Sequence, residues 1–274
     1  MSMAADPVAL GAERPRTGAM NGKLWGVRAE DWSRIQEPLV APAYEEALRR
    51  AGVHAGARLL DVGCGAGLAA LIASRLGAHV SGLDAAEPLL VIARQRTPAG
   101  QFQLGELEDL PFDAGRFDVV TGFNAFQYAA NPARALAEAR RVTRPGGRVV
   151  VMTWGRPEGM PAAGLLAALR PLLPPAPAGA AGPFALSDET RLRAFAVDSG
   201  LAVLEIFDTE TPWEYADLAT ALRALKSSGV AARAIGHSGE AAVDDAHAKA
   251  LEPYRLPGGR YRVNATFRSL LATA

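Results

Sequence analysis

Leu59-Leu60-Asp61-Val62-Gly63-Cys64-Gly65-Ala66-Gly67 joins an apolar, strand-like run to three glycines at alternate positions. The apolar run 68–76 follows with helical spacing. Glycines at this density let the backbone turn directly from a strand into a helix, and they let a ligand approach the main chain without a Cβ in the way. This segment therefore predicts a strand, a tight ligand-binding turn and a helix.

The charge beside this turn narrows the class of ligand. Asp61 places a carboxylate where a pyrophosphate would be repelled and an amino group attracted. A dinucleotide-binding turn also needs glycine at its first, third and sixth positions, and the sixth position counted from Gly63 is Leu68. The turn therefore favours S-adenosylmethionine over a dinucleotide.

Strand and helix signals alternate from residue 57 onward. Strands are expected at 58–62, 79–83, 101–104, 117–122 and 148–154, and helices at 68–76, 88–95 and 132–142. This alternation implies a parallel sheet that is covered on both faces. Further strands are expected at 201–207 and 261–270, with helices at 187–199, 216–227 and 239–251.

These elements predict an α/β fold: a Rossmann-like, doubly wound, seven-stranded and mostly parallel sheet with a helical N-terminal lid and a C-terminal helical insertion. Residues 1–56 are assigned to a tail and the lid, in which Pro38 and Pro42 break the helical stretch 29–51. Residues 57–274 form the main domain, with a linker at 156–186 and a helical cap insertion at 212–256.

The composition excludes several classes of function. The 29 Lys and Arg residues balance the 29 Asp and Glu residues, so no nucleic-acid or anionic membrane surface is expected. Cys64 is the single cysteine and the four histidines show no metal-ligand spacing, which argues against an internal disulfide and a metal site. No apolar run approaches the length of a membrane span, so we expect a cytoplasmic protein.

The order of several motifs makes a family resemblance specific. Asp84 ends the second strand, where an acidic side chain can accept hydrogen bonds from ribose hydroxyls. The chain resembles class I S-adenosylmethionine-dependent methyltransferases, of the subfamily related to the ubiquinone/menaquinone methyltransferases. The matching segments are 59–69, 80–84, Gly105-Glu106-Leu107-Glu108-Asp109-Leu110-Pro111-Phe112, 117–120 and 140–147.

The resemblance implies a set of cofactor-binding residues. It places Asp61, Gly63, Cys64, Gly65, Gly67 and Asn124 around the methionine part, Asp84 at the ribose, and Ala85, Glu106 and Leu107 at the adenine. Glu106 stands where the family usually has aspartate. The implied product is S-adenosylhomocysteine, and no metal is required.

A histidine pair that many relatives carry after the fourth strand is replaced here by Gln127-Tyr128. Methyl transfer from a sulfonium is already strongly driven, so proximity and alignment can carry much of the catalysis. The catalytic residue is left unknown. Tyr128 and His237 are weak candidates, and a base supplied by the cap is an alternative.

Aromatic side chains predict a pocket for the methyl acceptor. Candidate wall residues are Trp25, Trp32, Tyr128, Trp154, Trp213 and Tyr215. The expected reaction is methylation of O or N of a small molecule, with a specialised or quinone-like metabolite as acceptor. Alternatives are methylation of an aromatic or enolic carbon, and a cofactor-binding protein with a non-methylating role such as cyclisation. A homodimer is left open.

Overall fold

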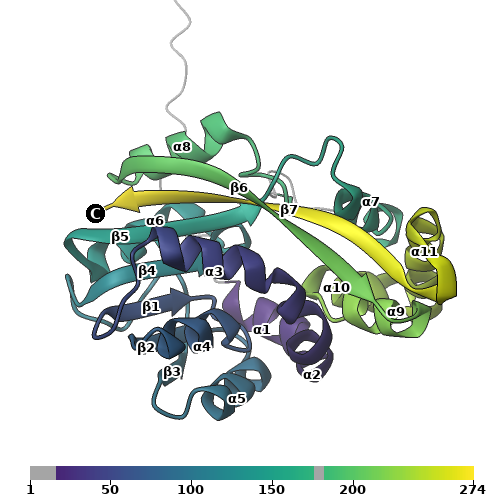
Figure 1. Cartoon of the computed structure of the whole chain (residues 1–274), viewed down its shortest axis with the longest axis horizontal. Coiled ribbons are helices and arrows are strands. Elements are labelled where there is room, and N and C mark those ends of the chain that lie inside the picture. Colours follow the sequence, from purple (N-terminus) through teal and green to yellow (C-terminus); the bar gives the residue numbers. More distant parts are fainter. Residues whose placement is uncertain (1–16, 176–181) are drawn as a thin grey trace, which may run out of the picture.

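A seven-stranded sheet in the order β3-β2-β1-β4-β5-β7-β6 organises the structure, a computed structural model that describes residues 17–175 and 182–274 (Figure 1). The strands are β1 (Arg58–Val62), β2 (His79–Asp84), β3 (Gln101–Leu104), β4 (Phe117–Phe123), β5 (Thr143–Trp154), β6 (Ala202–Tyr215) and β7 (Tyr261–Thr273). The first five pair in parallel, and β7 runs antiparallel to both of its neighbours. The predicted α/β fold is confirmed.

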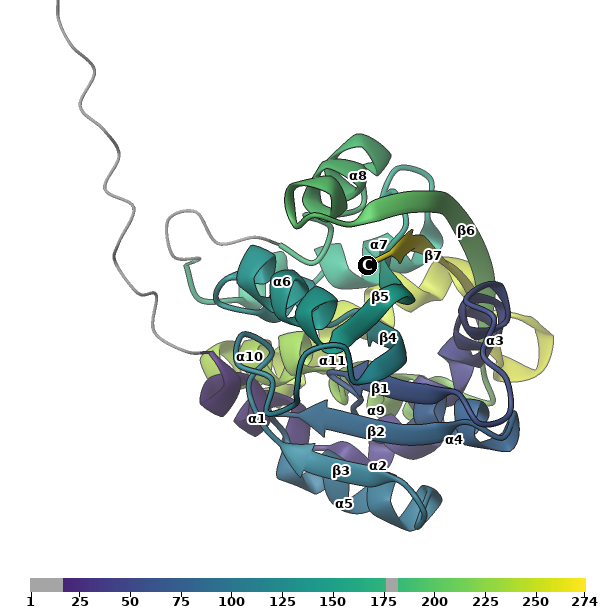
Figure 2. The ribbon, with the colours of Figure 1, turned by 90° about the vertical axis from the view of Figure 1, so that its left-hand side faces the viewer.

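Helices cover both faces of the sheet. On one face lie α3 (Ala41–Arg50), α4 (Leu68–Arg75) and α5 (Glu87–Arg96); on the other lie α6 (Pro132–Val142) and α8 (Glu189–Asp198). Figure 2 shows α3 and α6 on opposite sides of the sheet. Leu59 of β1 joins the first core and Leu60 the second, because successive strand side chains point to opposite faces.

The N-terminal lid is a chain of short helical pieces. These are α1 (Gly18–Gly26), α2 (Ala29–Asp31), a π-helical turn η1 (Trp32–Gln36) and a 3₁₀ turn η2 (Glu37–Val40), which leads into α3. Pro38 and Pro42 stand within the first two positions of η2 and α3, because proline fits the first turn of a helix. The stretch that they were expected to break is thus divided into four contiguous helical pieces. The helix α1 begins at Gly18, and the part of the expected tail that falls on residues 1–16 lies outside the described residues.

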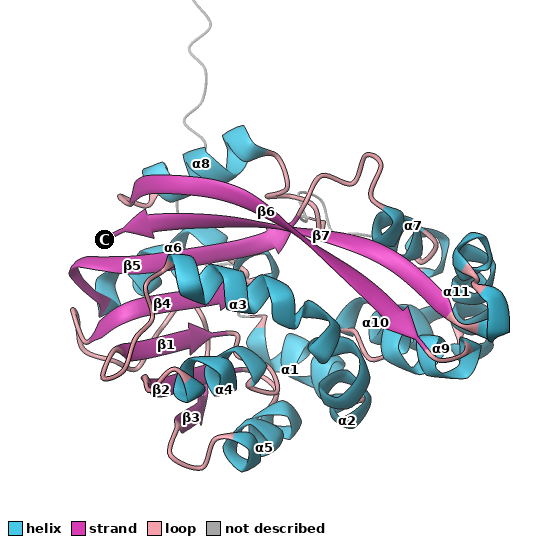
Figure 3. Cartoon of the chain, in the orientation of Figure 1, coloured by secondary structure: helices cyan, strands magenta, loops and turns pink. Residues whose placement is uncertain are grey.

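A long hairpin carries the C-terminal cap. Strands β6 and β7 pair from Ala202–Thr273 to Tyr215–Tyr261 and run well past the other strands (Figure 3). At their far end lie α9 (Leu218–Lys226), α10 (Gly229–Ser238), α11 (Glu240–Leu251) and, from the opposite side, α7 (Pro161–Ala167). Short 3₁₀ turns η3 (Phe126–Tyr128), η4 (Arg170–Leu172), η5 (Glu252–Tyr254) and η6 (Pro257–Gly259) connect these pieces.

Three boundaries in this region differ from the sequence prediction. Residues 212–215 belong to β6, so the cap insertion begins after Tyr215 rather than at 212. The expected linker 156–186 contains α7, whose Ala- and Leu-rich turn is buried against the cap. Residues 229–238, which lie between the expected helices, form α10, because Ser228 accepts a hydrogen bond from the Ala231 N–H and caps the helix.

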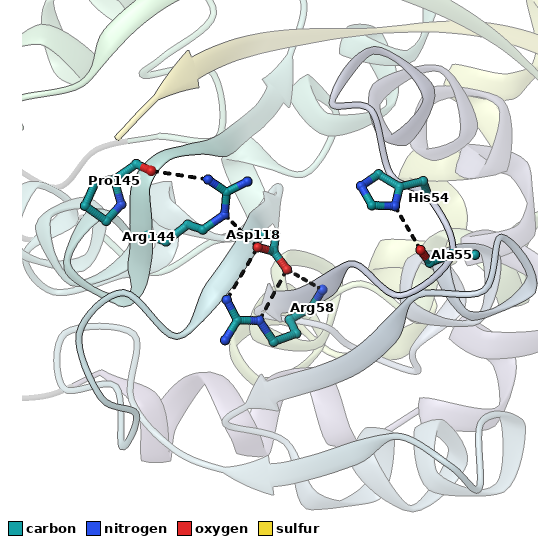
Figure 4. A network of polar contacts seen from close by, with 6 residues as sticks. All are labelled: His54, Ala55, Arg58, Asp118, Arg144 and Pro145. Carbon is teal, nitrogen blue, oxygen red and sulfur yellow. Dashed lines mark hydrogen bonds and ion pairs between the residues drawn. The ribbon is translucent and has the colours of Figure 1, made fainter.

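An ion-pair network closes the amino-terminal edge of the parallel strands (Figure 4). Asp118 accepts hydrogen bonds from the backbone N–H of Arg58 at 2.8 Å and from the Arg144 guanidinium at 2.6 Å. Burial raises the pKa of Asp118, but the hydrogen bonds from the two arginines outweigh it and hold this pKa well below its ordinary value. This network stabilises the edge of the sheet that lies opposite the cavity described below.

None of the helices in the described part of the chain is long and apolar enough to cross a lipid bilayer.

Candidate active site

One large cavity lies at the carboxyl ends of β1, β2 and β4. Its walls come from these strand ends, the lid segment 17–44, the loop 105–108, α7 and the cap. In an open α/β sheet this edge is where ligands bind, because the order of the strands reverses there. The cavity has a polar end beside the glycine turn and an apolar end under the cap.

The glycine turn has the geometry that the sequence predicts. Gly63, Gly65 and Gly67 have φ angles of 71°, 54° and 80°, in the left-handed region that favours glycine. A Cβ on Gly63 would stand 2.6 Å from the Ala125 side chain, so the turn also packs too closely for any other residue. Gly63 and Gly65 line the cavity, whereas Gly67 caps α4 beneath it.

Asp84 fastens the ends of the first two strands together. One of its carboxylate oxygens accepts from the Gly65 N–H and the other from the Ala86 N–H, each at 2.8 Å. Burial raises the pKa of Asp84, while these backbone hydrogen bonds lower it. The carboxylate lines the cavity with lone pairs to spare, which suits the hydroxyls of a ribose.

Asp61 is buried at the bottom of the polar end. It accepts a hydrogen bond of 2.7 Å from the Thr121 hydroxyl. Burial raises the pKa of Asp61 to about 7, against the hydrogen bond from Thr121, which lowers it, and with a further increase from Asp84. A cationic ligand would relieve this accumulation of negative charge.

Glu37 is a third buried acid at this end, and the sequence analysis missed it. It forms an ion pair with Arg96 and accepts a long hydrogen bond of 3.4 Å from the Leu68 N–H. Burial raises the pKa of Glu37 to about 6, although Arg96 lowers it. Arg96 also donates to the carbonyls of Ser33 and Ala66, so it ties the lid to the glycine turn.

The lid meets the adenine-side loop through Glu106. Its carboxylate accepts from the Gly18 N–H at 3.2 Å, at the start of α1. Asn21 of the same helix donates to the Tyr128 carbonyl at 3.0 Å. Asn124, at a φ of 51°, lines the cavity and accepts from Gln127 at 2.9 Å, so Gln127 holds a cavity residue in place.

The charges at the polar end test whether the implied cofactor fits. Carboxylates from Glu37, Asp61, Asp84, Glu106 and Glu108 line the cavity, and among the described lining residues there is no lysine or arginine. S-adenosylmethionine carries a sulfonium and an ammonium, so this lining is complementary to its two positive charges. A pyrophosphate would meet uncompensated repulsion.

Comparisons with known proteins agree with this geometry. Residues 60–151 match the methyltransferase domain family. The chain is 35% identical over 173 residues to an uncharacterised protein of Mycobacterium tuberculosis, which is 62% of each chain. It is 31% identical over 161 residues to a ubiquinone biosynthesis O-methyltransferase of Aromatoleum aromaticum, covering 57% of this chain and 66% of the relative. The chain thus spans 62% of the length of the first of these relatives.

The family is settled by these matches on this fold. Residues 60–151 are a domain of the class I S-adenosylmethionine-dependent methyltransferase family. The YcgJ protein of Bacillus subtilis has the same fold, with a TM-score of 0.58 over 85% of this chain and 98% of its own at 20% identity.

The apolar end of the methyltransferase cavity is aromatic. Trp154 packs against Trp213 and Phe267, with ring centroids 5.8 and 4.9 Å apart. The other walls of this distal chamber come from α7, α9, α10 and the residues beside them. They are aliphatic, as Ala162, Leu165, Leu166, Leu169, Ala224, Leu225 and Val230, except for Ser228, whose hydroxyl donates to the Leu225 carbonyl. The chamber is continuous with the polar end, so two ligands can lie in one cavity.

Two polar groups interrupt the apolar wall of this chamber. The indole Nε1 of Trp213 and the Nδ1 of His247 are buried without a hydrogen-bond partner. His247 is 2% exposed and lies on α11. Burial lowers the pKa of His247 to about 4, with an opposing effect from Asp244 and a further decrease from Lys226. The imidazole is therefore neutral at physiological pH.

The structure places most of the residues singled out from the sequence on the cavity wall. These are Asp61, Gly63, Cys64, Gly65, Asp84, Ala85, Glu106, Leu107 and Asn124 at the polar end, and Trp25, Trp32, Tyr128, Trp154 and Trp213 elsewhere. Tyr215 does not line the cavity: it is fully buried behind the wall and donates a 3.0 Å hydrogen bond to Gln36.

His237 is a correction among the catalytic candidates. It is exposed near the end of α10, bonded to Ser238, and does not line the cavity. Tyr128 lines the cavity, but burial raises its pKa to about 12. Neither side chain can accept a proton in the active site at neutral pH, whereas His247 was overlooked in the sequence.

Proposed function

We propose that this protein transfers the methyl group of S-adenosylmethionine to oxygen or nitrogen of a small, largely apolar molecule. One observation carries the proposal: the acidic glycine-turn end and the aromatic chamber form a single cavity. A cationic methyl donor fits the first and a flat acceptor the second. Holding the two together supplies most of the rate enhancement that such a displacement needs.

The acceptor is proposed to be a small molecule and not a nucleic acid. The cavity wall carries five carboxylates, which would repel phosphate groups, and the chain has no excess of basic residues. Two relatives support methylation at oxygen, since they are named malonyl-[acyl-carrier protein] O-methyltransferase, from Serratia marcescens, and ubiquinone biosynthesis O-methyltransferase. Serratia's protein is 37% identical over 40% of this chain and 43% of its own.

Each residue around the donor site is suited to a different part of S-adenosylmethionine. Asp84 is suited to hold the ribose hydroxyls and Glu106 the adenine amine, while Asp61 and Glu37 balance the positive charges of the donor. Trp25 packs edge-on against Trp32 and Tyr128, at 5.0 and 5.8 Å, and so closes the cavity from the lid side. A closed cavity keeps water away from the reactive sulfonium.

Calorimetric titration tests the donor site first. S-adenosylmethionine and S-adenosylhomocysteine should bind with micromolar affinity, and NAD should not bind. Asp84→Asn should weaken both affinities by about tenfold, because it removes a charge-assisted acceptor. Asp118→Asn is the matched control at the opposite edge of the sheet and should leave both affinities unchanged. Binding of NAD without binding of either adenosyl compound would overturn the proposal.

A second step tests the reaction itself. Incubation with S-adenosylmethionine and a panel of phenols, enols and amines should yield S-adenosylhomocysteine and a methylated product, whose mass spectrum and NMR locate the methyl group. A product methylated at carbon would replace O- or N-methylation. Binding without turnover would favour a non-methylating role; one protein with this fold, 21% identical with a TM-score of 0.55, is the [4+2]-cyclase SpnF.

A further inference from the structure

The distal chamber holds two buried polar groups that lack a hydrogen-bond partner. Trp213 and His247 are 4% and 2% exposed, and each has a ring nitrogen that is buried without a hydrogen-bond partner. They come from β6 and α11, which are separate elements. A buried polar group that lacks a partner costs about 1–3 kcal/mol, so two of them in one apolar chamber need a reason.

A bound molecule is the reason that the surroundings favour. Both side chains line the same cavity as the glycine turn. Apart from Ser228, whose hydroxyl donates to the Leu225 carbonyl, the other described walls of the chamber are aliphatic or aromatic. A ligand with a hydroxyl group and a second oxygen would satisfy both nitrogens: the hydroxyl would donate to the imidazole, and the second oxygen would accept from the indole N–H.

We propose that the distal chamber binds a flat, apolar acceptor through its hydroxyl group, that His247 receives the proton of this hydroxyl during methyl transfer, and that the indole N–H of Trp213 orients the acceptor. This inference rests on the proposed function and adds the acceptor class and a catalytic residue to it. A neutral hydroxyl suits the chamber better than an ammonium, because the carboxylates on the described cavity wall come from the polar end.

The step balances in atoms and charge. The acceptor oxygen forms a bond to the methyl carbon as the bond from that carbon to sulfur breaks and leaves its electron pair on sulfur. The O–H electron pair remains on oxygen, and the proton moves to the His247 imidazole. One positive charge thus leaves the sulfonium and appears on the imidazolium, so the net charge of the cavity is unchanged. An oxygen that is gaining a methyl group is strongly acidic, so a weak base suffices.

The charged groups around His247 are consistent with this role. On its own helix, Asp244 lies one turn before it and, with Glu240, holds Lys226 of α9 in ion pairs of 2.8 and 2.7 Å. The carboxylate of Asp244 can stabilise a positive imidazole, and Lys226 opposes it. The residues of α7 that line the chamber, Ala162, Leu165 and Leu166, carry no charge.

The test uses the full chain saturated with S-adenosylhomocysteine, with 1-naphthol as probe and 1-methoxynaphthalene as the matched probe without a hydroxyl proton. His247→Leu should weaken 1-naphthol binding about five- to tenfold and leave 1-methoxynaphthalene nearly unchanged. Trp213→Phe should weaken both probes by a few-fold, because both carry an oxygen. His237→Leu, on the exposed face of α10, is the matched control and should change neither.

NMR of the histidine rings gives a readout that is independent of turnover. In the wild-type complex the His247 signals should show a neutral imidazole from pH 5.5 to 8 and should shift on addition of 1-naphthol. With any acceptor found by screening, His247→Gln should lower kcat at least tenfold with a small change in KM.

Each outcome separates this inference from the proposed function. Loss of S-adenosylhomocysteine binding in the wild-type protein would overturn both. Normal binding of S-adenosylhomocysteine, with 1-naphthol bound equally by wild type and His247→Leu, would overturn the role of His247 alone. Failure of the wild-type complex to bind 1-naphthol would overturn the hydroxyl-bearing aromatic acceptor, and thermal unfolding of each variant confirms that it is folded.

Discussion

Single residues at the polar end of the cavity combine burial with negative charge. Asp61 and Glu37 have pKa values raised to about 7 and about 6, with burial as the main cause in each case. Their carboxyl groups therefore change charge within the pH range in which proteins are usually studied. The affinity for a cationic ligand should therefore depend on whether these two carboxyl groups are charged.

We therefore expect the affinity for S-adenosylmethionine to rise with pH. Below its folded-state pKa, Asp61 is protonated and neutral, so the cation loses an attractive partner; above it, the carboxylate is charged. If only the charged form binds, the affinity should be about tenfold weaker at pH 6 than at pH 8. Calorimetry at both pH values, in buffers with different ionisation enthalpies, measures the affinity and the protons released.

Asp61→Asn is the control for this pH dependence. The variant should bind more weakly at pH 8 and should lose most of the dependence on pH, with Glu37 responsible for what remains. An affinity that is equal at pH 6 and pH 8 in the wild-type protein would show that neither acid changes charge near the ligand.

A second prediction concerns the buried ion pair of Glu37. Its carboxylate is 3% exposed and Arg96 is its partner. Arg96→Met would leave this acid without a counter-charge and should lower the free energy of unfolding by about 3 kcal/mol at pH 7.5, measured by urea denaturation. The loss should shrink at pH 5, because protonation of Glu37 removes the unpaired charge.

The double variant Arg96→Met with Glu37→Gln separates charge from packing. It should recover more than half of the lost stability. A double variant as unstable as Arg96→Met alone would mean that the hydrogen bonds of Arg96 to the backbone carbonyls of Ser33 and Ala66, and not the ion pair, stabilise the lid.

At the scale of elements, the lid and the cap pack most closely where α1 meets α10. Gly229 begins α10, and a Cβ there would stand 2.6–2.8 Å from the indole of Trp25. Gly229→Ala should therefore displace Trp25 and weaken binding of S-adenosylmethionine several-fold, mainly by raising the dissociation rate, which stopped-flow fluorescence measures. Gly236→Ala, in the same helix with nothing within 4 Å of the added methyl group, should leave the dissociation rate unchanged and stabilise the helix by about 0.5–1 kcal/mol. Equal dissociation rates in the two variants would contradict the contact.

The helices and strands with a clear periodic pattern of apolar residues could be predicted from the sequence. The strand–turn–helix at 58–76 and the helix at 132–142 carry strong local signals, and the latter was predicted to its exact ends. The full length of β6 could not be predicted from the sequence, because Pro212 stands among its last residues and proline usually ends a strand. Proline is accepted there because β6 is an edge strand that pairs with β7 alone.

The site residues that belong to a local sequence motif could be predicted from the sequence. Asp61 and Asp84 follow buried strands directly, so their position follows from the topology. Glu37 and His247 reach the cavity only through tertiary packing of the lid and the cap. For His247 one signal existed: Val243, His247 and Leu251 recur every four positions and share the buried face of α11. Such spacing usually marks a core position, and the missing hydrogen-bond partner becomes visible only in three dimensions.

At the scale of the whole molecule, one end of the parallel strands stabilises the fold and the other end forms the cavity. Asp118 and its arginines stabilise the amino-terminal edge, and the cavity occupies the other. Asp118→Asn should lower the free energy of unfolding by about 1–2 kcal/mol at pH 7. Because the folded-state pKa of Asp118 is depressed, this contribution is complete above the unfolded pKa near 4 and is lost as the pH falls further.

Thermal unfolding of wild type and Asp118→Asn at pH 7 and pH 3.5 checks this prediction. The difference between the two melting temperatures should narrow at the lower pH. A gap that is constant across both pH values would assign the effect to packing of the side chain and not to its charge.

The long hairpin of β6 and β7 has a consequence for how the protein can diversify. The three cap helices α9, α10 and α11 lie in the chain between the end of β6 and the start of β7, whereas the donor-binding turn is built from β1, β2 and the lid. Tyr215 and Tyr261 are paired across the hairpin, so the two ends of the segment between them lie side by side. This segment could therefore be exchanged for that of a relative by joining the chain at one pair of residues. Such an exchange would replace the chamber wall that α9, α10 and His247 of α11 contribute, and it would keep Trp154, Trp213 and the wall from α7. We therefore expect chimaeras cut at this pair to change only the part of the acceptor preference that the cap helices set.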